Sequence, residues 1–145
     1  MMSKRMISIL IIMLITITVV YFFKKNVYCN NIENISISDS LLLVAYDYNY
    51  DYCNLIREAL IGKEKAIIEF SLLEFSDGMI YEHGEIIIKI IKKIGERKFL
   101  NLLRKYKISY ENKRIIYYYV LSGFPLQDEE IFKKKFPQLY KYLQS

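Results

Sequence analysis

Four oxygen-bearing side chains between residues 47 and 58 have the spacing of an EF-hand calcium loop. Positions 1, 3, 5 and 12 of such a loop hold the ion through carboxylate or amide oxygens, and here they are filled by Asp47, Asn49, Asp51 and Glu58. Position 6, where the loop needs glycine for a sharp turn, is Tyr52. The alternation of tyrosine with polar residues also fits a short extended segment or an exposed turn between helices. The sequence therefore leaves two hypotheses, a weak calcium-binding module and a turn.

His83 is the single histidine of the chain, and it is the first candidate for acid–base chemistry. Possible carboxylate partners stand close by in sequence, at Asp77, Glu82 and Glu85. Adjacent residues diverge on a helix, however, and no H-E-x-x-H motif is present. We therefore keep a small hydrolase-type enzyme that uses His83 and nearby carboxylates as an alternative to a non-catalytic protein.

The two cysteines, Cys29 and Cys53, could pair in an oxidising compartment. Neither has a histidine or a second cysteine at metal-ligand spacing. We expect no cofactor, and whether the two cysteines pair is left open.

Residues 6–23 form an apolar run of 18 residues without a charge, flanked by basic residues on both sides. A bilayer-spanning helix needs about 20 apolar residues, whereas the apolar core of a cleaved signal spans about 7–15. We predict that residues 1–23 are a signal-anchor, that 6–23 contact the membrane, and that the domain lies on the extracytoplasmic side. The alternative is a cleaved signal peptide and a secreted or periplasmic protein. Residues 24–38, rich in asparagine and serine, are predicted to be a polar linker.

Residues 39–145 have mainly helical apolar periodicity. Isoleucines stand at i, i+3, i+4 and i+7 from Ile87 to Ile94, and a similar stripe runs from Phe99 to Tyr106 after Gly95. Asp128 is predicted to cap one short helix, and Pro137 to begin the next. The prediction is an all-α domain.

The segment "IGKEKAI" at 61–67 resembles "IGERKFL" at 94–100, and a third polar break follows at Gln127, so the breaks are spaced by 33 residues. Repeats of helix pairs have periods in this range, but the signatures of tetratricopeptide and ankyrin repeats are absent. Two architectures remain, a small helical bundle and a short stack of helix pairs.

Charge is distributed unevenly along the chain. Residues 26–88 carry 3 basic and 11 acidic side chains, whereas residues 89–114 carry 10 basic and 2 acidic ones. The basic residues fall on the polar faces of two amphipathic helices, which is typical of a solvated face, so we expect no nucleic-acid partner. Three consecutive tyrosines, 117–119, cannot all face one core, so at least one is predicted to be exposed. Exposed tyrosine is enriched at protein interfaces.

Taken together, these features favour a membrane-tethered or exported module that binds another protein. We infer no small-molecule substrate from them. One concrete version is an immunity- or inhibitor-type protein.

Overall fold

The computed structural model of the protein describes residues 11–17, 29, 32, 35–76 and 78–145. Every regular element among these residues is helical, which confirms the all-α class. After a short helical stretch at 11–17, the elements are α2 (Asp39–Asp47), α3 (Tyr52–Leu60), α4 (Glu64–Ser71), α5 (Met79–Ile94), α6 (Glu96–Lys105), α7 (Tyr110–Ser122), the 3₁₀ helix η1 (Pro125–Gln127), α8 (Glu129–Lys135) and α9 (Pro137–Leu143).

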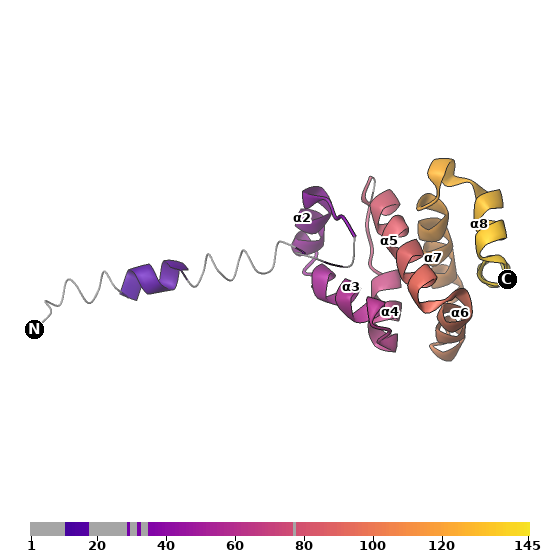
Figure 1. Ribbon diagram of the computed structural model, residues 1–145, viewed down its shortest axis with the longest axis horizontal. Helices are drawn as coiled ribbons and strands as arrows, with labels where there is room; N and C mark the ends of the chain where they lie inside the picture. Colours follow the sequence, from indigo (N-terminus) through magenta and orange to yellow (C-terminus); the bar gives the residue numbers. More distant parts are fainter. Residues whose placement is uncertain (1–10, 18–28, 30–31, 33–34, 77) are drawn as a thin grey trace, which may run out of the picture.

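Helix α5 lies at the centre of the domain, with α2, α3 and α4 on one side and α6, α7 and α8 on the other (Figure 1). Its isoleucines explain this position, because the predicted stripe at Ile87, Ile90 and Ile91 is buried. Ile86 and Ile88 are buried as well, so α5 is covered around most of its circumference. Only the polar face with Glu85, Lys89, Lys92 and Lys93 stays exposed, and a helix with so wide an apolar face must be enclosed by other helices.

Two glycines separate consecutive helices at equivalent places in the similar segments. Gly62, between α3 and α4, has φ 86°, and Gly95, between α5 and α6, has φ 90°. Glycine adopts such angles without steric cost, so each residue permits a tight change of chain direction. The predicted break at Gly95 is confirmed.

The two short C-terminal helices begin as their sequences predict. The Asp128 carboxylate accepts hydrogen bonds from the backbone N–H groups of Glu130 (2.9 Å) and Ile131 (3.1 Å), which caps α8. Pro137 is the first residue of α9, where its missing N–H costs no hydrogen bond. Tyr106 is exposed, contrary to the predicted stripe, because α6 ends one residue earlier at Lys105.

Helices α5 and α7 cross at two glycines, Gly84 and Gly123. A Cβ atom on Gly84 would lie 2.1 Å from the carbonyl oxygen of Tyr119, and one on Gly123 would lie 2.4 Å from the carbonyl carbon of Gly84. The two backbones therefore touch directly, and only glycine fits at either position.

No helix among the described residues is long and apolar enough to cross a membrane. The described part of the predicted span is the helical stretch at 11–17. The rest of the predicted span, 6–10 and 18–23, lies outside the described residues. This finding contradicts the predicted localisation as a single-pass membrane protein with a signal-anchor helix.

Candidate functional site

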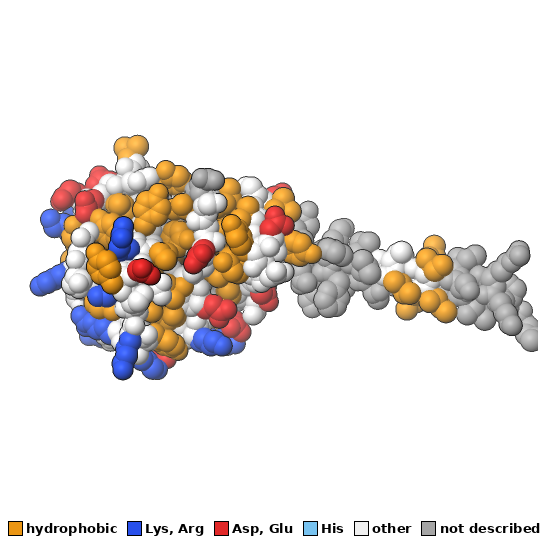
Figure 2. Space-filling view, turned by 180° about the vertical axis from the view of Figure 1, so that it is seen from behind, with side chains coloured by type: hydrophobic (Ala, Val, Ile, Leu, Met, Phe, Trp, Pro, Cys, Tyr) orange, Lys and Arg blue, Asp and Glu red, His pale blue; other side chains and the backbone are white. Residues whose placement is uncertain are grey.

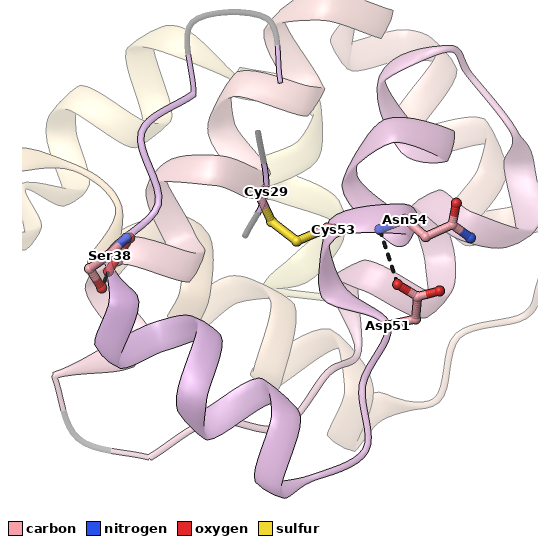
Figure 3. The surroundings of a disulfide bond; sticks show 6 residues. Cys29, Ser38, Asp51, Cys53 and Asn54 are labelled. Atoms are coloured by element: carbon pink, nitrogen blue, oxygen red, sulfur yellow. Dashed lines mark hydrogen bonds between the residues drawn. A yellow bond between two sulfur atoms is a disulfide. The ribbon is translucent and has the colours of Figure 1, made fainter. Parts of the chain in front are cut away.

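Three of the four calcium-ligand candidates lie at the junction of α2 and α3. Asp47 is the last residue of α2, and Asn49 stands in the turn that follows, with φ 59°. Asp51 is the N-cap of α3, and its side chain accepts a hydrogen bond from the backbone N–H of Asn54 at 3.4 Å (Figure 3). These residues build the turn between two helices, which was the second hypothesis for this segment.

Glu58 lies near the other end of α3, where it forms an ion pair with Lys63 at 2.6 Å. It lies seven positions after Asp51 along the helix, a rise of about 10 Å, whereas ligands of one Ca²⁺ stand within about 2.6 Å of the ion. In the part of the chain that the structure describes, no three His, Cys, Asp or Glu residues are grouped so as to hold a metal ion. The calcium hypothesis therefore gains no support from the fold.

Cys29 and Cys53 form a disulfide, with their Cα atoms 5.2 Å apart (Figure 3). Cys53 is buried in the first turn of α3, and Cys29 belongs to the predicted polar linker. Ile32 from that same segment is buried in the hydrophobic core. The described residues of the segment are thus attached to the domain by a covalent bond and by apolar packing.

His83 is fully buried inside α5, among the rings of Tyr52, Phe70, Phe75 and Tyr119. Its Nδ1 is hydrogen-bonded to the hydroxyl of Tyr52 at 2.9 Å, and its Nε2 has no hydrogen-bond partner among the described residues. Burial lowers the pKa of His83 to about 3, and the nearby Phe70 backbone opposes this shift only in part. The ring is therefore neutral at physiological pH and cannot reach a substrate.

The carboxylates that were candidate partners of His83 are engaged elsewhere or face away. Glu82 accepts hydrogen bonds from the backbone N–H and the hydroxyl of Ser38, both at 2.5 Å. Glu85 is exposed on the outer side of α5, and Asp77 lies outside the described residues. Among the described residues no carboxylate is paired with His83, so the enzyme alternative gains no support there.

Two buried tyrosines beside His83 have structural hydrogen bonds. The Tyr119 hydroxyl donates to the carbonyl of Leu73 (2.8 Å) and accepts from the N–H of Phe75 (2.9 Å), so it fixes the segment between α4 and α5. Burial, followed by the charge of Glu82 and by Tyr119, raises the pKa of Tyr52 well above its usual value. Both phenols therefore remain protonated, and their hydrogen bonds stabilise the core.

The basic side chains of α6 and the start of α7 are mostly exposed. In Figure 2 the Lys and Arg side chains gather at the left and lower left of the domain. Lys105 forms an ion pair with Glu64 of α4 at 2.5 Å, a link between the basic and acidic halves of the chain. Lys113 and Arg104 lie 4.3 and 5.6 Å from the ring centroid of Tyr142. These contacts connect α6 and α7 to the C-terminal helix.

Beside this basic surface, α7 and the end of α9 enclose an open groove of about 680 Å³. Tyr110 and Tyr118 stand on its wall with 65% and 47% of their surface exposed, and Arg114 lies between them in the sequence. Ile115 and Leu143 add apolar surface to the groove. We call the stripe formed by Tyr110, Arg114 and Tyr118, together with its apolar lining, the tyrosine groove.

Tyr117 also lines the groove and is fixed by hydrogen bonding. The hydroxyls of Tyr117 and Tyr140 both donate to Oε1 of Glu129, each at 2.7 Å. Burial, and then the bond to Glu129, raise the pKa of Tyr117 to about 12, while the two phenols lower the pKa of Glu129. This part of the groove is therefore held in place by hydrogen bonds within the domain.

The prediction that at least one of the three consecutive tyrosines is exposed is confirmed, because Tyr119 is buried and Tyr118 is not. The spacing of the other residues in the stripe is also visible in the sequence, although the predictions above did not include it. Tyr110, Arg114 and Tyr118 are spaced at i, i+4 and i+8, so they share one face of a helix. Leu143, from the far end of the chain, had no local signal that would place it there.

Comparisons with protein-family models, with curated proteins and with solved structures found no significant match to this chain. The functional argument therefore depends on the geometry described above.

Proposed function

We propose that the protein is a non-catalytic binding module whose tyrosine groove takes an acidic segment of a partner protein. The observation that carries the proposal is the exposed stripe of two tyrosines and an arginine on α7. Tyrosine and arginine are enriched at interface hot spots, because they bury a large area and also make polar bonds. Packing within the domain does not explain why these side chains are exposed, whereas contact with a partner protein would explain it.

Charge supports an acidic partner. Lys and Arg outnumber Asp and Glu by 10 to 2 across residues 89–114, which include α6 and the start of α7. Arg114 and Glu111 both line the groove, and α6, whose basic side chains are exposed, packs against α9, which carries the other wall. A field of one sign raises the association rate of an oppositely charged partner and selects against one of like charge.

Preorganisation supports the same function. Glu129 holds Tyr117 and Tyr140, and Tyr142 is held by Lys113 and Arg104, so several groups on α7 and α9 are fixed in the free protein. A binding surface that is already ordered loses less conformational entropy when its partner docks.

The test is a selection from a phage-displayed library of random peptides against the full-length, oxidised chain. We expect enriched peptides to carry Asp or Glu beside aromatic or aliphatic residues. A synthetic peptide from this pool should bind Tyr118→Ala or Arg114→Glu at least about tenfold more weakly. Lys89→Ala, which removes an exposed cation from α5, is the matched control and should bind as the wild type does. Enrichment of basic peptides, or peptides that bind the Tyr118 variant equally well, would contradict the proposal.

A further inference from the structure

The turn between α7 and α8 exposes a leucine completely. Leu126 is 100% exposed, and its backbone lies in the left-handed region with φ 55°, followed by Gln127 with φ 51°. Leucine rarely adopts this conformation, and a fully exposed leucine gains nothing from burial in the core. The stability of the isolated chain therefore explains neither feature, and strained exposed residues of this kind concentrate at binding sites.

Hydrogen bonds hold this turn in a single shape. The backbone N–H groups of Gln127 and Asp128 donate to the carbonyls of Phe124 (3.0 Å) and Pro125 (3.2 Å). The Gln127 side-chain amide donates to the hydroxyl of Tyr81 on α5 at 2.9 Å. The leucine is thus presented on a rigid support, which reduces the entropy lost on binding.

A hollow of about 480 Å³ lies at the foot of this turn, between α5 and the end of α7. Ser122 lines it with only 3% of its surface exposed, and in the described part of the chain its hydroxyl has no hydrogen-bond partner. A buried hydroxyl without a partner is destabilising, and a polar group of a ligand that enters the hollow would satisfy it. This is an observation independent of the exposed leucine, and it points to the same place.

The surroundings of the hollow are acidic. Glu85 stands in its lining, and α8 begins beside the turn with Asp128, Glu129 and Glu130. No Lys or Arg occurs between residues 74 and 88 or between 115 and 132, the two segments that form this end of the domain. In Figure 2 acidic side chains cluster at the upper left of the domain, above the basic ones.

We propose that Leu126, Pro125, Ser122, Tyr81 and Glu85 form a second docking surface, the Leu126 site, for a polypeptide segment in which Lys or Arg stands beside an apolar residue. The cation would pair with Glu85, the apolar side chain would pack on Leu126 and Pro125, and a backbone polar group would bond the Ser122 hydroxyl. The Leu126 site does not rest on the tyrosine groove. The two surfaces share no residue, because the groove takes residues between Tyr110 and Tyr118 from α7, whereas the Leu126 site takes Ser122 and the turn that follows, so one molecule can join two partners.

The experiment selects random displayed peptides on the full-length, oxidised chain after depletion on the Leu126→Ala variant. A synthetic peptide from the enriched pool should contain Lys or Arg and should lose at least about tenfold in affinity on Leu126→Ala and on Glu85→Gln. Ile61→Ala is the matched control, because Ile61 is an aliphatic residue 71% exposed elsewhere on the surface, and it should leave the affinity unchanged. Tyr118→Ala should also leave it unchanged, which separates this proposal from the tyrosine groove.

Ser122→Ala distinguishes a serine that binds the peptide from one that only supports the fold. It removes a hydroxyl that has no partner, so the free chain should melt at the same or a higher temperature while peptide affinity falls. Failure to enrich any peptide that depends on Leu126, or enrichment of acidic peptides, would overturn the proposal. Sedimentation that shows a dimer of the wild type and a monomer of Leu126→Ala would overturn it as well, because the occupant would be a second copy.

Discussion

Replacing Gly84 by alanine tests the close crossing of α5 and α7 on which both proposed binding surfaces depend. The new Cβ would lie 2.1 Å from the Tyr119 carbonyl oxygen and 2.8 Å from the Gly123 nitrogen, whereas ordinary contact begins at 3.4 Å. The helices must therefore separate by roughly 1.3 Å, because backbone atoms cannot rotate away as side chains do. Overpacking of this kind costs about 1–3 kcal/mol or more, and the higher helix propensity of alanine returns about 1 kcal/mol.

Because a contact of 2.1 Å with backbone belongs at the upper end of that range, we expect a net loss of about 2 kcal/mol in the free energy of unfolding, which lowers the melting temperature by roughly 6–12 °C for a domain of this size. Urea and thermal unfolding followed by far-ultraviolet circular dichroism would measure it. Gly78→Ala is the matched control, because nothing lies within 4 Å of its Cβ and its φ of −61° suits alanine. If Gly84→Ala unfolds within about 0.5 kcal/mol of the wild type, the helices are not in direct backbone contact and the reasoning fails.

Three further predictions concern the core around α5 and the segment that precedes α2. Burial lowers the pKa of His83 to about 3, below the usual 6.5, so below pH 6.5 the unfolded chain binds a proton that the folded chain refuses. The free energy of unfolding should therefore fall by up to about 1.4 kcal/mol per pH unit as pH drops from 6.5 towards 3. Between pH 6.5 and 5 the slope of this free energy against pH should be flatter in His83→Gln. Equal slopes in the variant and the wild type would refute the burial argument. Reduction of the Cys29–Cys53 disulfide, whose cysteines are 24 residues apart, should cost about 3 kcal/mol, and a reductant should leave the unfolding midpoint of Cys29→Ser unchanged. Tyr119→Phe should cost about 2 kcal/mol, because it removes two buried hydrogen bonds, and hydrogen exchange should accelerate at Phe75 with little change in α9.

Local features of the structure were predictable because their causes are local. The isoleucine stripe of α5, the cap at Asp128, the first-turn proline at Pro137 and the break at Gly95 each arise from a few neighbouring residues. Even the failure at Tyr106 is small, since it concerns only where α6 ends.

Features that depend on distant residues were not predictable from one sequence. Gly84 and Gly123 are 39 residues apart, and nothing near either of them in sequence indicates a contact. The burial of His83 arises from rings that α3, α4 and α7 contribute, so its surroundings could not be inferred from its neighbours in the sequence. The place of helix α3, which begins at Tyr52 and lies between Asp51 and Glu58, could likewise not be read from the EF-hand spacing alone.

The three consecutive tyrosines of α7 show why core and surface cannot be altered independently in this domain. Successive residues of a helix point about 100° apart, and here Tyr119 fixes the loop before α5, Tyr117 joins Glu129 on α8, and Tyr118 faces solvent. A displacement of α7 therefore moves the tyrosine groove and the end of the helix that carries Ser122 at the same time. Loss of peptide binding in Gly84→Ala would not identify a contact residue, whereas loss in Tyr118→Ala or Leu126→Ala, both exposed, would.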